Sequence, residues 1–173
     1  MIRAARTDDA GILREVERRA GERFRDIGMP EIADAEPMSS AELSAYARAG
    51  RSWVVVDADD RPVAYAVVDI LDHAAHVEQL SVEPEHQAKG WGRALIDHVE
   101  TWAASGSLRA LTLTTFRDVA WNRPLFEHLG FRVLNDEELT AGLELKRARE
   151  ATLGLDPVLR VCMAREVRSR PAG

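Results

Sequence analysis

The residues of this chain with the clearest chemical pattern lie between positions 76 and 95. A strand-like segment ending at Leu80-Ser81-Val82 is followed, after a short turn, by Gln87-x-x-Gly90-x-Gly92, where an amphipathic helix begins. Two glycines at a helix start let the backbone come close to a ligand, and the first N–H groups of a helix have no partner within it. Those donors and the positive helix end suit a phosphate or pyrophosphate, and Lys89 and Arg93 add positive charge beside them.

Two common phosphate-binding folds do not match this pattern. A dinucleotide-binding fold needs a third small residue where this chain has Leu95, and an acid at the end of the next strand. That strand ends Thr112-Leu113-Thr114-Thr115 instead. A Walker loop needs Gly-Lys-Ser/Thr after four intervening residues, and the chain has none.

The hydrophobic periodicity predicts the elements that position this segment. We expect strands at 2–5, 52–56, 63–71, 75–82, 108–115, 131–134 and 159–165. We expect helices from a cap at Thr7 or Asp8 to Phe24, from a cap at Ser39 or Ser40 to just before Gly50, and over 90–104, 121–129 and 137–151, with a loop at 26–38. Strands that first follow one another and then alternate with helices indicate an α/β (α+β) fold. Its mixed central sheet would have about six to seven strands, with helices on both faces.

Composition limits the class of protein. The 173 residues are 46% hydrophobic and 30% charged, which predicts one globular domain over 1–173, with 166–173 as a flexible tail. The longest apolar run, Val63 to Val68, is far too short to cross a bilayer, so we expect no membrane partner. The net charge of −6 argues against nucleic acid. The single cysteine, Cys162, cannot form an internal disulfide and fits a reducing, cytoplasmic location.

Residues 74 to 135 resemble the GNAT superfamily of acetyl-CoA-dependent N-acetyltransferases. The strand ending Leu80-Ser81-Val82, the Pro84 turn and Gln87-x-x-Gly90-x-Gly92 are similar to the acyl-CoA-binding signature of that family. The run from Asn122 to Phe131, which ends Leu-Gly-Phe, looks like its second signature. Two motifs about thirty residues apart make a chance agreement improbable.

The resemblance implies that acetyl-CoA is the co-substrate and gives each matched position a role. Backbone amides from Gln87 to Arg93 would hold the pyrophosphate, backbone groups of Leu80 and Val82 would pair with the pantetheine arm, and Asn122 would bond it from the opposite side. The full implied cofactor-binding set is Leu80, Ser81, Val82, Gln87, Ala88, Lys89, Gly90, Trp91, Gly92, Arg93, Ala94, Asn122 and Phe126. The acceptor would be a primary amine of a small molecule or an exposed amine of a protein.

Two side chains on the strand before the loop are candidates for proton transfer. A primary amine has a pKa near ~10.4, so its neutral form costs about 4–5 kcal/mol at pH 7 and a base is valuable. Glu78, two residues before Leu80, is the leading candidate for that catalytic base, directly or through a water, and His76 is the second. The alternative is that both only hydrogen-bond neighbouring loops.

One position departs from the family pattern. Many relatives carry a tyrosine that protonates the leaving sulfur, whereas this chain has Phe126, which cannot donate a proton. A non-catalytic acyl-CoA-binding domain therefore stays open as an alternative. An unrelated α/β phosphate binder, outside the family, is a third reading. The five histidines show no ligand spacing with cysteine or acids, so we expect no metal. We also expect that two copies could pair through the basic C-terminal region.

Overall fold

The computed structural model describes residues 1–168, and its contacts divide the chain into two units. The first unit comprises residues 1–68 and 79–98, and the second comprises residues 69–78 and those from 99 onward. Strands β3 and β4 and helix α4 each run from one unit into the other. The prediction of a single domain over the whole chain stays a prediction.

Seven strands form one mixed sheet in the order β1-β2-β3-β4-β5-β7-β6, which confirms the predicted α+β class. The strands are β1 (Ile2–Ala4), β2 (Ser52–Val56), β3 (Pro62–Leu71), β4 (Ala74–Val82), β5 (Ala110–Phe116), β6 (Arg132–Val133) and β7 (Arg160–Glu166). The helices are α1 (Ala10–Gly21), α2 (Pro30–Ala33), α3 (Ser40–Arg48), α4 (Trp91–Ser105), α5 (Arg123–His128) and α6 (Ala141–Thr152). Strands β4 and β5 pair in parallel, while β1–β2, β2–β3, β5–β7 and β6–β7 pair antiparallel.

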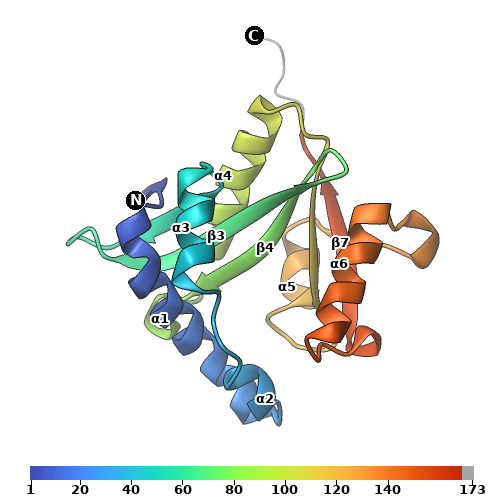
Figure 1. The fold of residues 1–173 in the computed structure, drawn as a ribbon, viewed down its shortest axis with the longest axis horizontal. Coiled ribbons are helices and arrows are strands. Elements are labelled where there is room, and N and C mark those ends of the chain that lie inside the picture. The colour runs from blue at the N-terminus through green and yellow to red at the C-terminus, as the bar shows by residue number, and fades with distance from the viewer. Residues whose placement is uncertain (169–173) are drawn as a thin grey trace. The chain divides into compact units, whose positions relative to one another are not determined.

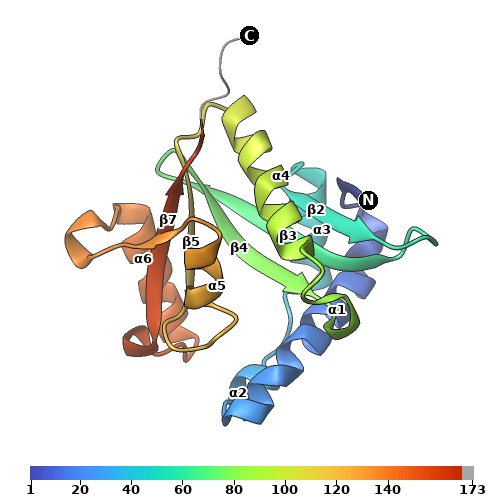
Figure 2. The same ribbon diagram turned by 180° about the vertical axis from the view of Figure 1, so that it is seen from behind.

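In the first unit, helices cover both faces of the sheet. Alternate residues of β2 and β3, among them Val54 and Tyr65, pack with Leu13 and Val16 of α1 and Leu43 of α3 in one buried cluster. Figure 1 shows α1 and α3 in front of this part of the sheet, and Figure 2 shows the start of α4 on its other side. There the ring of His98 in α4 meets Trp53 edge-on, with 5.6 Å between ring centroids.

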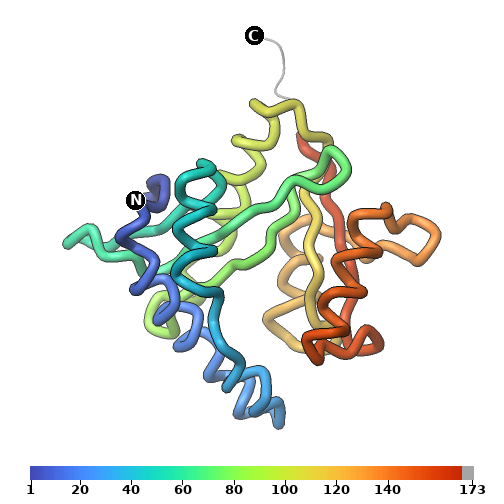
Figure 3. The backbone as a smooth tube through the Cα atoms, viewed as in Figure 1, coloured from blue at the N-terminus to red at the C-terminus, as the bar shows by residue number. Residues whose placement is uncertain are grey.

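In the second unit, adjacent residues of β5 point to opposite faces, as the period of a strand requires. The hydroxyl of Thr114 bonds Glu150 of α6, and the hydroxyl of Thr115 bonds Asn122, which directly precedes α5. The backbone trace in Figure 3 shows β5 and β7 side by side, in agreement with their pairing from Ala110↔Glu166 to Phe116↔Arg160.

Several predicted boundaries are wrong. The segment 26–38 is not all loop, because Pro30, whose ring favours the first turn of a helix, starts the short α2. The helix expected at 121–129 runs from Arg123 to His128. The helix expected at 137–151 begins at Ala141, because the Thr140 side chain accepts the N–H of Leu143 and caps the helix there.

The C-terminal end is described only as far as Arg168. Glu166 still belongs to β7, and the guanidinium of Arg168 bonds the carboxylate of Glu100 at 2.8 Å. The rest of the predicted flexible tail, residues 169–173, lies outside the described residues. None of the helices within residues 1–168 has the length and apolar character needed to cross a membrane.

Candidate active site

The predicted phosphate-binding loop connects β4 to α4 within the first unit. A single 3₁₀ turn, Pro84–His86, follows β4, and Gln87 continues in an extended conformation. Ala88 and Gly90 then take positive φ angles of 58° and 80°. Only glycine takes that conformation without steric cost, which explains Gly90 and makes Ala88 a strained position.

The start of α4 has several backbone donors that the helix does not use. Its first hydrogen bond runs from the N–H of Ala94 to the carbonyl of Gly90, at 2.9 Å, so the N–H groups of Trp91, Gly92 and Arg93 precede it. Among the described residues, a Cβ at position 92 would meet the Leu80 side chain at 3.9 Å, an ordinary contact distance. The packing of the protein therefore does not require glycine at position 92, whereas a ligand held closely against the backbone would.

The side chain of Gln87 is turned toward the protein. Its amide donates to the carbonyl of Val82 at 3.0 Å, and its oxygen accepts from Arg23 at 3.2 Å. Burial lowers the pKa of Arg23 to about 10. Gln87 thus ties the loop to the end of β4 and to the segment after α1. Lys89 and Arg93, by contrast, are exposed.

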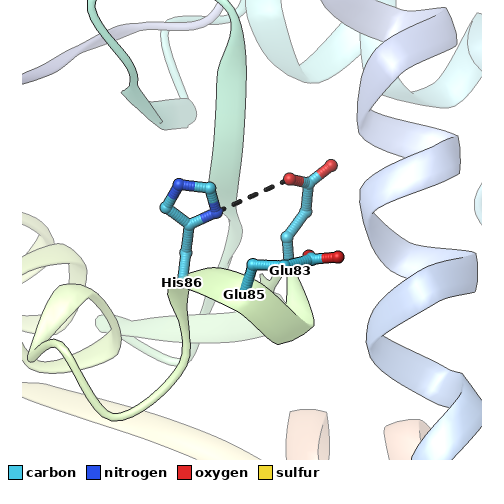
Figure 4. Close-up of side chains that lie close together, drawn as sticks. All are labelled: Glu83, Glu85 and His86. Atoms are coloured by element: carbon cyan, nitrogen blue, oxygen red, sulfur yellow. Dashed lines mark ion pairs between the residues drawn. The ribbon is translucent and has the colours of Figure 1, made fainter.

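The base of the loop is held by a buried carboxylate. Glu83 is 2% exposed, and its oxygens accept from Arg19 of α1 at 3.0 Å and from Arg61 at 2.7 and 3.1 Å. Figure 4 shows its ion pair with His86, at 3.6 Å, and Glu85 beside them. These last three side chains are close enough to share a metal ion. Both carboxylates are already neutralised by arginines, since Glu85 also pairs with Arg19. The expected absence of a metal stays a prediction.

A buried hydrogen-bond network lies under the end of β4. The Ser81 hydroxyl accepts from Gln79 at 2.8 Å and bonds the hydroxyl of Tyr65, which in turn donates to Glu17 of α1 at 2.6 Å. Burial raises the pKa of Tyr65 well above its usual value, and the charge of Glu17 adds to this. The Ser81 side chain is therefore engaged within the protein, and any contact it makes with a cofactor would come from its backbone.

In the second unit, Glu78 belongs to an ion-pair group centred on Lys146. Its carboxylate accepts from the Nζ of Lys146 in α6 at 2.7 Å, and the same nitrogen lies 3.3 Å from the carboxylate of Asp69 in β3. The Lys146 side chain is 13% exposed and the two acids 25%. Burial acts to lower the pKa of Lys146, but the hydrogen bond and charge of Glu78, together with Asp69, raise it overall.

His76 lies beside this group and is almost fully buried. Its Nδ1 is 2.9 Å from the hydroxyl of Thr112 in β5, and its Nε2 is 3.8 Å from the Glu78 carboxylate. Burial, with the nearby charge of Lys146, lowers the pKa of His76 to about 4. The imidazole is therefore neutral at physiological pH.

Asn122 and Phe126 lie at the start of α5 and within it. The Asn122 side-chain oxygen accepts from Thr115 at 2.6 Å, while its amide nitrogen is buried with no hydrogen-bond partner among residues 1–168. A buried donor without a partner costs about 1–3 kcal/mol, so this nitrogen is suited to a ligand carbonyl. Phe126 is buried and meets the ring of Phe131 edge-on, 5.7 Å between centroids.

The predicted residues thus fall into two sets. The first unit holds Leu80 to Val82 and Gln87 to Ala94, and the second holds the pair His76 and Glu78 and the pair Asn122 and Phe126. No local sequence pattern predicts the ion pairs that Lys146 makes with Glu78 and Asp69, because Lys146 is 68 residues from Glu78 in the chain. The one available signal was that Lys146 is one of only two lysines.

The comparisons with known proteins agree with this architecture. Residues 14–131 match the model of the acetyltransferase (GNAT) family. The structure is similar to the ribosomal-protein-S18-alanine N-acetyltransferase of Escherichia coli (20% identity, TM-score 0.66), covering 100% of this chain and 96% of that one. It is also similar to Mycobacterium tuberculosis Rv2747 in complex with CoA (17%, 0.68; 97% and 99% covered). A third match is the PaiA N-acetyltransferase of Thermoplasma acidophilum with coenzyme A (16%, 0.68; 96% and 98% covered).

The structural matches, all at or below 20% identity, support the fold, and the family model covers more than half of the chain. The resemblance read from the two motifs is therefore confirmed. This chain belongs to the GNAT family of acetyltransferases, which use acetyl-CoA.

Proposed function

We propose that this protein transfers an acetyl group from acetyl-CoA to a primary amine, carried by a small molecule or exposed on a protein. The observation that carries the proposal is the open backbone at the start of α4. There, three N–H groups precede the first helical hydrogen bond, and Gly92 leaves room that the protein itself does not fill.

Acetyl-CoA would be held by complementary backbone and side-chain groups. The amides from Gln87 to Arg93 bind the pyrophosphate, with Lys89 and Arg93 adding positive charge at its edge. Backbone groups of Leu80 and Val82 pair with the pantetheine arm like an added strand. The buried amide nitrogen of Asn122, which has no acceptor among the described residues, donates to a carbonyl of the same arm.

Glu78 would remove the proton from the acceptor amine. The Glu78 carboxylate accepts from the Lys146 ammonium at 2.7 Å, its side chain is 25% exposed, and the neighbouring His76 is neutral. A partly exposed carboxylate favours an incoming ammonium. The carboxylate of Glu78 then takes a proton, directly or through a water, and the neutral amine attacks the thioester.

The sulfur would leave as a thiolate without a side-chain acid. Phe126 has no proton to give, and the Tyr65 hydroxyl is buried and donates to Glu17. A thiolate resembling cysteine, with a pKa near ~8.5, costs only about 2 kcal/mol at pH 7 relative to the thiol. This cost is smaller than that of deprotonating the amine, so the base matters more than the acid.

Two measurements test the proposal. Calorimetry should detect acetyl-CoA binding to the purified protein, and CoA release should be stimulated by members of a panel of primary amines, with products identified by mass spectrometry. Binding of acetyl-CoA without turnover of any amine in a broad panel would favour the alternative, a non-catalytic acyl-CoA-binding domain. Absence of binding would remove the proposed function.

A further inference from the structure

The chain has an unusual distribution of side-chain amines. Of its 23 basic lysine and arginine residues, only Lys89 and Lys146 are lysines. An arginine guanidinium stays charged at every physiological pH and is a poor nucleophile, whereas a lysine amine can lose its proton. Lys89 lies exposed in the loop before α4, and Lys146 lies against the candidate base.

The contact between Lys146 and Glu78 has the geometry that the proposed reaction requires of an acceptor. General-base catalysis needs the amine within about 2.6–3.2 Å of the base, and the Lys146 nitrogen lies 2.7 Å from a Glu78 oxygen. Asp69 holds the same nitrogen from a second strand at 3.3 Å. The Lys146 side chain is 13% exposed, so its amine is held in position and still has access to solvent.

We propose that Lys146 is an internal acetyl acceptor, so that the protein acetylates itself at this residue when no external amine is bound. This inference rests on the proposed function. The Lys146 ammonium gives one proton to Glu78, and its nitrogen then bonds to the acetyl carbon of acetyl-CoA while the carbon–sulfur bond breaks. The second proton leaves the nitrogen and neutralises the thiolate. The products are N-acetyl-lysine, free CoA and one proton released from Glu78.

Acetylation of Lys146 would also change the charge of the ion-pair group that Lys146 forms with Asp69 and Glu78. An acetylated Lys146 carries no charge, so Asp69 and Glu78 would lose the positive charge of its ammonium and the local negative charge would increase. The protein would then offer the Glu78 carboxylate to an external ammonium without a competing internal amine. Self-acetylation is thus expected to precede, and to favour, turnover of a cationic acceptor.

The test uses the full chain incubated with acetyl-CoA alone, followed by peptide mass spectrometry of both lysines. We expect acetylation of Lys146 to be at least ~10-fold faster than that of Lys89, with a first-order rate that does not change on dilution. Lys146→Arg keeps the positive charge and removes the reactive amine. It should abolish the fast addition of one acetyl group to the intact protein.

Glu78→Gln distinguishes enzymatic acetylation of Lys146 from spontaneous acetylation, because the two predict opposite changes in the acetylation rate. An enzymatic reaction loses its base and should slow by ~10²-fold or more. A spontaneous reaction should accelerate, since the released amine loses its ion pair and becomes easier to deprotonate. Faster labelling of Lys146 in Glu78→Gln, or equal labelling of both lysines in the wild type, would overturn the inference. Turnover of an external amine without acetylation of Lys146 would overturn the self-acetylation proposal but not the proposed function.

Discussion

Replacing Gly92 separates the requirements of the fold from those of the ligand. A Cβ at this position meets the Leu80 side chain at 3.9 Å, so Gly92→Ala introduces no clash within residues 1–168. Alanine is a better helix former than glycine by up to about 1 kcal/mol, so the free energy of unfolding should stay equal or rise slightly. The same Cβ stands where the ligand would approach the backbone. Acetyl-CoA affinity should fall at least ~10-fold, about 1.4 kcal/mol, with Gly92→Val more severe.

The assay pairs calorimetric titration of acetyl-CoA with thermal unfolding of the ligand-free protein. Gly11→Ala is the matched control, because Gly11 is also helical and lies in the same unit. Within the described part of the chain, an added Cβ there meets no atom within 4 Å outside its own helix and chain neighbours. It should show the same change in stability and no change in affinity. Unaltered acetyl-CoA affinity in a folded Gly92→Val protein would refute the placement of the pyrophosphate at the start of α4.

Three further predictions concern the second unit. Glu78→Gln should lower turnover of an external amine ~10²–10⁴-fold at neutral pH, with partial recovery at high pH as the amine deprotonates; a pH–rate profile identical to wild type would assign the base elsewhere. Burial lowers the pKa of His76 from 6.5 to about 4, so the unfolded state binds a proton first as pH falls. As the pH falls between those two values, the free energy of unfolding of the wild type should decrease by about 1.4 kcal/mol per pH unit more than that of His76→Gln. The total difference should level off near ~3 kcal/mol. Urea unfolding at a series of pH values measures it, and equal pH dependence in the two proteins would contradict the prediction. Phe126→Tyr should raise turnover less than ~10-fold, because the ring packs on Phe131 and the site was not shaped to orient the new hydroxyl proton. A hundredfold gain in steady-state CoA release would contradict this and show that the natural protein lacks an essential acid.

The fold class and the loop before α4 could be predicted because their signals are local. A strand, a proline turn and two glycines at a helix start lie within about fifteen residues, and each constrains its neighbours directly. The start of α6 was missed by four residues because acidic residues at 137 and 138 look like a helix start, whereas Asn135 caps only one 3₁₀ turn there.

The surroundings of the candidate base could not be predicted. Whether a glutamate on a strand stands alone or is paired depends on which side chain the tertiary fold brings to it, and Lys146 comes from a helix far along the chain. The same holds for Asn122. Its motif suggested a ligand contact, but only the structure shows that the Asn122 oxygen accepts from Thr115 while its nitrogen has no partner within residues 1–168.

The buried carboxylate of Glu83 has a consequence for the thermodynamics of ligand capture. By joining Arg19 of α1 and Arg61 before β3, it fixes the turn from which the loop departs. The conformational entropy of that turn is therefore lost during folding, and little remains to be lost when acetyl-CoA arrives. The amides of the turn should already be slow to exchange with deuterium in the free protein, and association should proceed without a slow ordering step. A glutamate that never touches the ligand would in this way set how quickly the ligand is captured.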